Sequence, residues 1–209
     1  FGLAERATDW RGNNNIAESI IGQLALEAEP EPEWIVCGAG TGGTSATIGR
    51  YLRYRRLPTQ LCVAEPSGSG FVHGWRDRDP AARATRPTVI EGIGRPCVEP
   101  CFLFDVVDDV LEVPDAASIA AMNLLEHLLG RRYGGSSGTN FAACLQLAAT
   151  MRARGERCSI VGLLCDRGER YAETLFDAHW LAAHGLDPAP WQDALAACLA
   201  DGRWHTPAP

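Results

Sequence analysis

The sequence predicts an α/β fold: a mostly parallel sheet flanked by helices. Short apolar runs alternate with longer helix-like patterns along the whole chain, and a glycine-rich turn directly follows the first run. Strands that alternate with helices favour a parallel sheet whose two faces are both covered. No repeat or linker interrupts the pattern, so we expect one α/β domain over residues 1–209, with a C-terminal tail at 188–209.

The first half gives its elements in a clear order. Asn13–Asn15 are good N-terminal caps for a helix over 16–28, which the EPEPE stretch ends. Trp34–Cys37 reads as a short buried strand, and the glycine-rich turn after it leads into a helix whose last turns, at 50–56, are rich in arginine. Leu61–Ala64 is the second predicted strand.

The second half opens with residues 66–104, which are rich in Gly, Pro and Arg, and we expect long loops there. We expect Asp115 to cap the helix that follows the third strand, and one short amphipathic helix within 185–209. The other predicted elements are a strand at Val110–Val113, helices at 116–130 and 138–153, a buried strand at Ser159–Leu164 and a last long helix from Glu169 to about His184.

Composition excludes several classes of partner. The net charge of −7 attracts neither nucleic acid nor an anionic membrane surface. No apolar run reaches the about 18 residues that a membrane span needs, so a cytoplasmic protein is expected. The eight Cys form no C-x-x-C pair and the five His show no ligand spacing, so we expect reduced core thiols and no metal site.

The chain contains no lysine, because all nineteen basic residues are arginine. It begins at Phe1, and its first methionine is Met122. We therefore expect it to be the C-terminal portion of a longer protein.

The turn after the first strand predicts an anion site. Backbone N–H groups in such a turn and at the helix N-terminus point at the ligand, and the helix dipole favours negative charge. Gly40, Gly42 and Gly43 allow a close approach of the backbone, while Thr41 and Thr44 add hydroxyl donors. A tight turn without a ligand is the simpler alternative.

A dinucleotide site is the second functional interpretation of this turn. Gly38, Gly40 and Gly43 satisfy G-x-G-x-x-G after a strand, and Glu65 ends the next strand, where an acid for a ribose would lie. A Walker loop is excluded because its lysine is absent.

Five motifs in order resemble one known family, the fold-type II pyridoxal-phosphate enzymes that include cysteine synthase and cystathionine β-synthase. They are G-T-G-G-T at 40–44, V-A-E-P at 63–66, E-G-I-G at 91–94, G-G-S-S-G at 134–138 and D-R-G-E-R-Y at 166–171. Within this family, residues 7–20 and 178–187 look most like bacterial L-cysteine desulfhydrases.

The resemblance implies the large domain of such an enzyme, incomplete because the N-terminal half is missing, with pyridoxal 5′-phosphate as cofactor. It implies that Gly40–Thr44 hold the phosphate, that Ser136 meets the pyridine nitrogen, and that Gly92 and Gly94 lie beside the substrate. It further implies a homodimer that converts L-cysteine to hydrogen sulfide, pyruvate and ammonia, or that carries out a related β-replacement.

Other interpretations of these residues stay open. Ser136 fits the G-x-S-x-G of a hydrolase elbow, but that motif needs a preceding strand and a helix-like segment precedes it here. Ser136 could also simply begin a helix, and Gly92 and Gly94 could simply form a turn.

The resemblance also shows what the chain lacks. The family's Schiff-base lysine lies on the N-terminal half, and arginine cannot replace it because a guanidinium stays protonated. We therefore assign no catalytic residue to this chain. Three hypotheses remain: part of a cysteine lyase or synthase, an NAD(P)-binding domain, or a non-catalytic relic that keeps the phosphate pocket.

Overall fold

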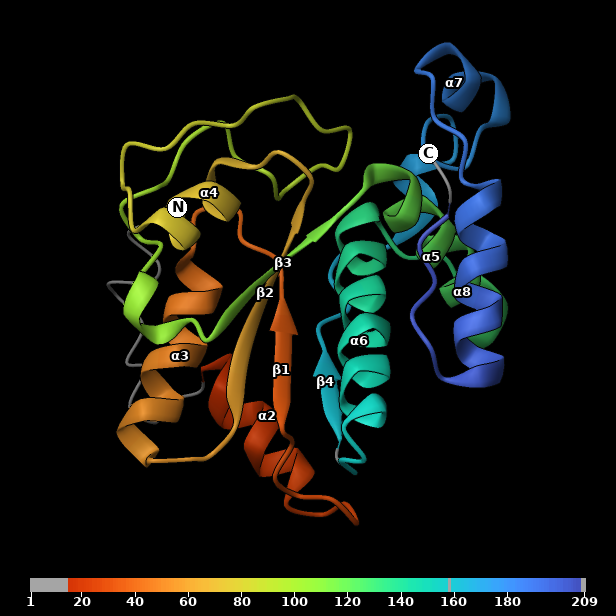
Figure 1. The fold of residues 1–209 in the computed structure, drawn as a ribbon. Coiled ribbons are helices and arrows are strands. Elements are labelled where there is room, and N and C mark those ends of the chain that lie inside the picture. The colour runs from red at the N-terminus through yellow and green to blue at the C-terminus, as the bar shows by residue number, and fades with distance from the viewer. Residues whose placement is uncertain (1–14, 158, 208–209) are drawn as a thin grey trace.

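The computed structural model describes residues 15–157 and 159–207. Four parallel strands form its sheet in the order β3-β2-β1-β4 (Figure 1): β1 (Trp34–Cys37), β2 (Gln60–Pro66), β3 (Asp109–Val113) and β4 (Ile160–Gly162). The predicted α/β class with a parallel sheet is confirmed, and β1 has the predicted bounds. Because β1 pairs with β2 on one side and β4 on the other, the chain reverses its direction of winding between β1 and β4.

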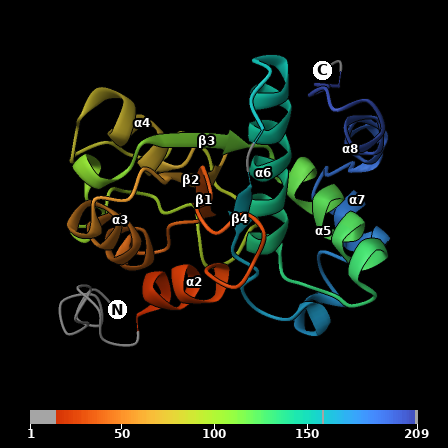
Figure 2. The same cartoon turned by 90° about the horizontal axis from the view of Figure 1, so that it is seen from below.

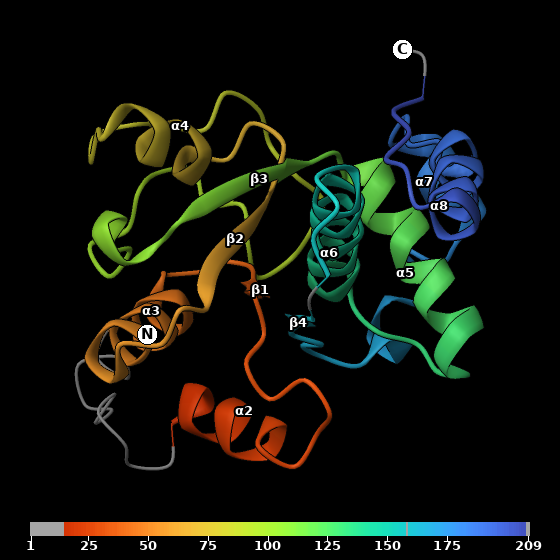
Figure 3. The same ribbon diagram turned by 60° about the horizontal axis from the view of Figure 1, so that its bottom comes forward.

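Helices cover both faces of the sheet. On one face α2 (Ile16–Leu24) and α3 (Gly43–Arg55) lie side by side (Figure 3). On the other, α6 (Gly135–Ala153) packs on the strands and separates them from α5 (Asp115–Leu129) and α8 (Ala189–Asp201), as Figure 2 shows. The sheet is therefore buried from both sides, as its continuous apolar strands require.

The strands divide their side chains between two cores. Ile35 and Val63 belong to the core shared with α3, whereas Val36 and Cys62 belong to the core shared with α6. All four are fully buried. The alternation follows from the two-residue period of a strand, which sends successive side chains to opposite faces.

The structure corrects the prediction of long loops at 66–104. A helix, α4 (Gly70–Asp77), lies within that range. The hydroxyl of Ser69 caps it by accepting a hydrogen bond from Phe71 N at 3.2 Å, and Phe71 and Val72 are fully buried. The cap and the burial of these two apolar residues stabilise a helix here, although the glycines in this segment predict a turn.

Two helix starts also differ from the prediction. Asn15 caps α2 as expected, accepting from Glu18 N at 3.0 Å, but Pro114 takes the N-cap position of α5 in place of Asp115. The helix predicted at 138–153, α6, begins at Gly135 rather than at residue 138, so Ser136 lies in its first turn. Asn13 and Asn14 lie outside the described residues.

Three predicted elements are shorter or divided. α2 ends at Leu24, because no buried partner extends it, and Leu26 is 87% exposed. β4 keeps only three residues of the predicted strand, and these are partly exposed because β4 lies at the edge of the sheet.

The long helix predicted from Glu169 to His184 is instead a 3-10 turn, η2 (Gly168–Tyr171), and a separate helix, α7 (Ala178–Ala183). Asp177 starts α7 as its cap, accepting from Trp180 N at 2.7 Å. A further 3-10 turn, η1 (Phe104–Val106), precedes β3.

Within residues 15–157 and 159–207, no helix is long and apolar enough to cross a membrane. The same residues contain no group of three or more His, Cys, Asp or Glu side chains arranged to hold a metal ion.

Candidate active site

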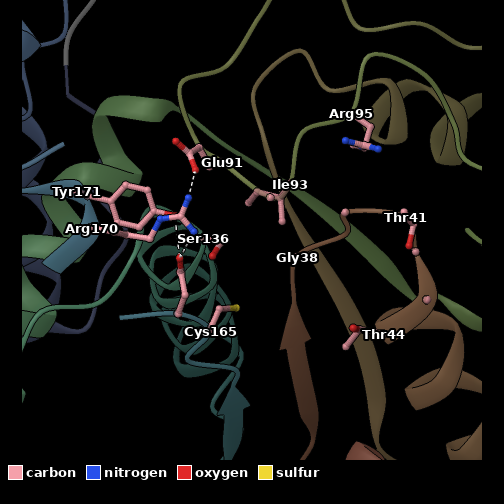
Figure 4. Close-up of a pocket in the computed structure, with 15 residues that line it drawn as sticks. Gly38, Thr41, Thr44, Glu91, Ile93, Arg95, Ser136, Cys165, Arg170 and Tyr171 are labelled. Atoms are coloured by element: carbon pink, nitrogen blue, oxygen red, sulfur yellow. Dashed lines mark hydrogen bonds and ion pairs between the residues drawn. The ribbon is translucent and has the colours of Figure 1, made fainter. Parts of the chain in front are cut away.

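A cavity of about 510 Å³ opens where β1 and β4 end (Figure 4). Its walls come from the turn after β1, the 91–94 loop with Arg95 directly after it, the first turn of α6 and the segment after β4. In open α/β sheets, ligands bind outside the carboxyl ends of the strands, at the point where the winding reverses. The cavity occupies that point between β1 and β4.

The first wall is the N-terminus of α3 with the turn before it, residues 40–44, which we call the cup. Gly42 caps α3 in the left-handed conformation, with a φ of 84°. Among the described residues, no acceptor faces the backbone N–H groups of Thr41, Gly43 and Thr44. Free N–H groups at the positive end of a helix make a site for an anion.

The cup fits closely against its own chain as well. A side chain at Gly42 would place its Cβ 2.5 Å from Phe102 Cα, and one at Gly40 would place it 2.5 Å from Gly92 O. Both contacts are closer than any Cβ atom tolerates. The sequence therefore needs glycine at these two positions to form the cup, whether or not a ligand is bound.

The opposite wall is the start of α6, where Ser136 is 7% exposed and lines the cavity. Cys165 lies next to it on the segment after β4. Burial raises the pKa of the Cys165 thiol, while the hydroxyls of Ser136 and Ser137 lower it. The Ser137 hydroxyl accepts a hydrogen bond from Cys165 N at 2.8 Å and so holds this segment against α6.

An ion pair joins two of the segments that line the cavity (Figure 4). Arg170 lies 2.7 Å from Glu91 of the 91–94 loop and 3.7 Å from Asp166 of the segment after β4. Asp166 also accepts a hydrogen bond from the Tyr171 hydroxyl at 2.7 Å. Burial raises the pKa of Tyr171, and the bond to Asp166 raises it further, so the phenol stays a proton donor.

The structure brings the predicted residues together. Gly40–Thr44, Gly92 and Ser136 all line the one cavity. Gly94 lies just outside this lining, with a φ of 72° and its N–H turned to Glu65. Ser136 lies in the first turn of α6, and the element before it is helix α5. A hydrolase elbow requires a strand in that place.

Glu65 does not lie where a ribose ligand would need it. It is fully buried, and both of its carboxyl oxygens already accept hydrogen bonds, from Ala39 N, Ser69 Oγ and Gly94 N. No oxygen of Glu65 is left for a sugar hydroxyl. This geometry disfavours the dinucleotide interpretation.

Sequence reasoning gave no weight to several residues of the site. Cys165, Arg95 and the pair Glu91 and Arg170 line the cavity. Glu91 and Arg170 belong to the motifs at 91–94 and 166–171 but were given no role in the site, and Cys165 and Arg95 belong to no motif. The available signal was position: Cys165 follows a predicted strand, and residues after the carboxyl ends of parallel strands gather at the ligand site.

Comparison with known proteins places this geometry in a family. Residues 4–166 match the family model described as pyridoxal-phosphate dependent enzyme. The chain is 54% identical over 204 residues to L-cysteine desulfhydrase Cds1 of Mycobacterium tuberculosis, a match that covers 98% of this chain and 55% of that protein.

Two further matches are more distant. Cysteine synthase 2 of Schizosaccharomyces pombe is 30% identical over 196 residues, covering 88% of this chain and 48% of that protein. The crystal structure of O-ureido-L-serine synthase has the same fold, with a TM-score of 0.66 at 24% identity, over 87% of this chain and 53% of the other.

The chain spans about half the length of the curated relatives it matches. The family match covers most of the chain and confirms the resemblance carried by the five motifs. The chain therefore belongs to the family of pyridoxal-phosphate dependent enzymes.

Proposed function

We propose that the cup binds the phosphate of pyridoxal 5′-phosphate in a lyase or synthase that acts on L-cysteine. One observation carries this proposal: Thr41, Gly43 and Thr44, whose N–H groups have no acceptor among the described residues, lie at the positive end of α3 and line the cavity that Ser136 also lines. A phosphate dianion suits such donors. A cavity of about 510 Å³ is also of the size usual for small-molecule sites.

Ser136 is proposed to meet the pyridine nitrogen. When bound, pyridoxal 5′-phosphate supplies an electron-accepting ring that stabilises negative charge at the Cα of an amino acid. The Ser136 hydroxyl is neutral, so it orients the ring nitrogen without holding a proton on it as a carboxylate would. A serine here favours loss of a group from Cβ over transamination.

The loop with Gly92 and Gly94 is proposed to lie beside the substrate. Gly92 has a φ of 88° and faces open space, so its backbone is accessible from the cavity. The Arg170–Glu91 pair borders this loop.

L-cysteine is the proposed substrate, supported by the 54% identity to L-cysteine desulfhydrase Cds1. Its β-elimination with one water gives hydrogen sulfide, pyruvate and ammonia. The 30% identity to cysteine synthase 2 supports β-replacement as the related alternative. A cytoplasmic homodimer is proposed as the working form.

The amine that this chemistry needs must come from outside this sequence. The 209 residues contain no lysine, and arginine stays protonated and cannot serve as the nucleophile. The cup, Ser136 and the 91–94 loop bind and orient; they transfer no proton at Cα.

Calorimetric titration and a sulfide assay test the proposal together. The chain should bind pyridoxal 5′-phosphate, and Ser136→Ala should weaken binding roughly fivefold, as expected for one lost hydrogen bond. The chain alone should release no sulfide from L-cysteine, whereas sulfide and pyruvate should appear in equal amounts when a lysine-bearing segment of the enzyme is present. Binding without sulfide in both cases would favour a non-catalytic relic, and sulfide from the chain alone would refute the argument from lysine.

A further inference from the structure

Glu65 does not line the cavity, but it contacts the turn that leads into the cup. The carboxyl group is 0% exposed. One oxygen accepts from Ala39 N at 2.7 Å, and the other accepts from Ser69 Oγ at 2.7 Å and from Gly94 N at 3.1 Å. Burying a carboxyl group costs stability unless its hydrogen bonds are satisfied, and here three donors converge on it.

The two backbone segments that Glu65 joins are two of the four that line the cavity. Ala39 lies between Gly38 and Gly40, both of which line the cavity, and Gly94 ends the loop that forms another of its walls. The segments touch directly: a Cβ at Gly38 would lie 2.7 Å from Ile93 Cγ2. Figure 4 shows Ile93 next to Gly38.

Bonds to Ala39 and Gly94 from a single side chain fix the spacing of these segments. β2 is the strand next to β1, so the carboxyl group of Glu65 is anchored to the centre of the sheet. A movement of either segment breaks a hydrogen bond to a buried group, which cannot be replaced by one to water. Glu65 therefore acts as a clamp between Ala39, which directly precedes the cup, and the 91–94 loop.

We propose that Glu65 is a positioning residue of this site, holding the cup and the 91–94 loop in the arrangement that binds the cofactor phosphate without touching the cofactor. This inference rests on the proposed function of the cup. It adds to the site a residue that supports the cup from outside the cavity.

Replacement of Glu65 by Gln separates the clamp from simple burial. Gln has the same size but offers one oxygen and one NH₂ group. With its oxygen on Ala39 N, its NH₂ group faces Ser69 Oγ, which can accept, and Gly94 N–H, which cannot. Glu65→Gln should therefore release the Gly94 amide while leaving the Ala39 amide protected.

Glu112→Gln is the matched control. Glu112 lies beside Glu65 in the β2–β3 ladder and holds a different backbone group, accepting from Gly68 N at 3.0 Å. Gly68 does not line the cavity. The control therefore repeats the same chemical change on the neighbouring strand, away from the site.

The experiment compares the full chain and both variants by amide hydrogen exchange and by calorimetric titration with pyridoxal 5′-phosphate. Glu65→Gln should speed exchange at Gly94 and raise the dissociation constant about tenfold, and Glu112→Gln should change that constant less than about twofold.

Each other outcome is decisive. If the unaltered chain binds the cofactor and Glu65→Gln binds it equally well, the inference is overturned and the proposed function stands, even when the melting temperature of the variant falls. If Gly94 exchange is unchanged, the clamp itself is refuted. If the unaltered chain does not bind the cofactor, the proposed function is refuted. The claim that Glu65 supports cofactor binding is then refuted as well.

Discussion

Gly42→Ala should be strongly destabilising, because Gly42 combines a left-handed backbone with no room for a Cβ atom. Its φ is 84°, and a side chain in that region costs roughly 1–2 kcal/mol. The added Cβ would lie 2.5 Å from Phe102 Cα and 2.7 Å from Phe102 N, so backbone atoms must shift. Overpacking of this kind costs about 1–3 kcal/mol, which brings the expected loss to about 2–5 kcal/mol.

Gly130→Ala isolates the cost of a side chain in the left-handed region from the cost of overpacking. Gly130 caps the end of α5 with a φ of 68°, and nothing lies within 4 Å of the Cβ it would gain. It should lose only the roughly 1–2 kcal/mol of the left-handed backbone.

Urea unfolding of both variants measures the difference, with equal m-values as the sign that the change lies in stability. The reasoning about the cup would be refuted if Gly42→Ala lost no more stability than Gly130→Ala.

Three other predictions follow from single contacts. Asp115→Ala should speed hydrogen exchange at Val89, because the Asp115 carboxylate accepts from Val89 N at 2.9 Å; unchanged exchange would contradict the contact. Tyr171→Phe removes the 2.7 Å hydrogen bond to Asp166 and should lower the free energy of unfolding by about 1 kcal/mol in a urea titration, and an unchanged midpoint would count against it. Burial raises the pKa of Glu65 from its ordinary 4.5 to about 8, so between these pH values the folded chain keeps a proton that the unfolded chain has lost. The free energy of unfolding should therefore fall as pH rises through this range, and Glu65→Gln should show a shallower fall; parallel profiles would contradict this.

The central part of the fold could be predicted from the sequence because local and tertiary preferences agree there. Trp34–Cys37 is apolar, β-prone and bounded by breakers, and the structure buries it as β1 between β2 and β4. The turn that follows has glycine where the backbone is left-handed at Gly42. In such segments the pattern already contains the physical constraint.

The elements that were mispredicted depend on contacts between distant segments. The residues around α4 look like a loop until Phe71 and Val72 find the core beside α3. The helix expected from Glu169 is divided because Tyr171 turns inward to Asp166 and Leu175 enters the small core beneath the 91–94 loop. Neither contact is visible in a local pattern.

The residues of the candidate site also divide into those that a local motif predicts and those that depend on contacts between distant segments. The cup and Ser136 belong to short continuous motifs and could be identified from them. The Glu91–Arg170 pair joins residues 79 positions apart, and the Glu65 clamp joins three loops. Their partners are known only when the sheet brings those segments to one edge.

The most direct test of the account is amide chemical-shift mapping of the chain during titration with pyridoxal 5′-phosphate, with inorganic phosphate and NAD as separate titrants. The account predicts that pyridoxal 5′-phosphate and inorganic phosphate both shift the amide signals of Thr41, Gly43 and Thr44. It also predicts that only the cofactor shifts Ser136. Saturable shifts at 38–43 with NAD alone, or cofactor shifts that leave these amides unmoved, would contradict it.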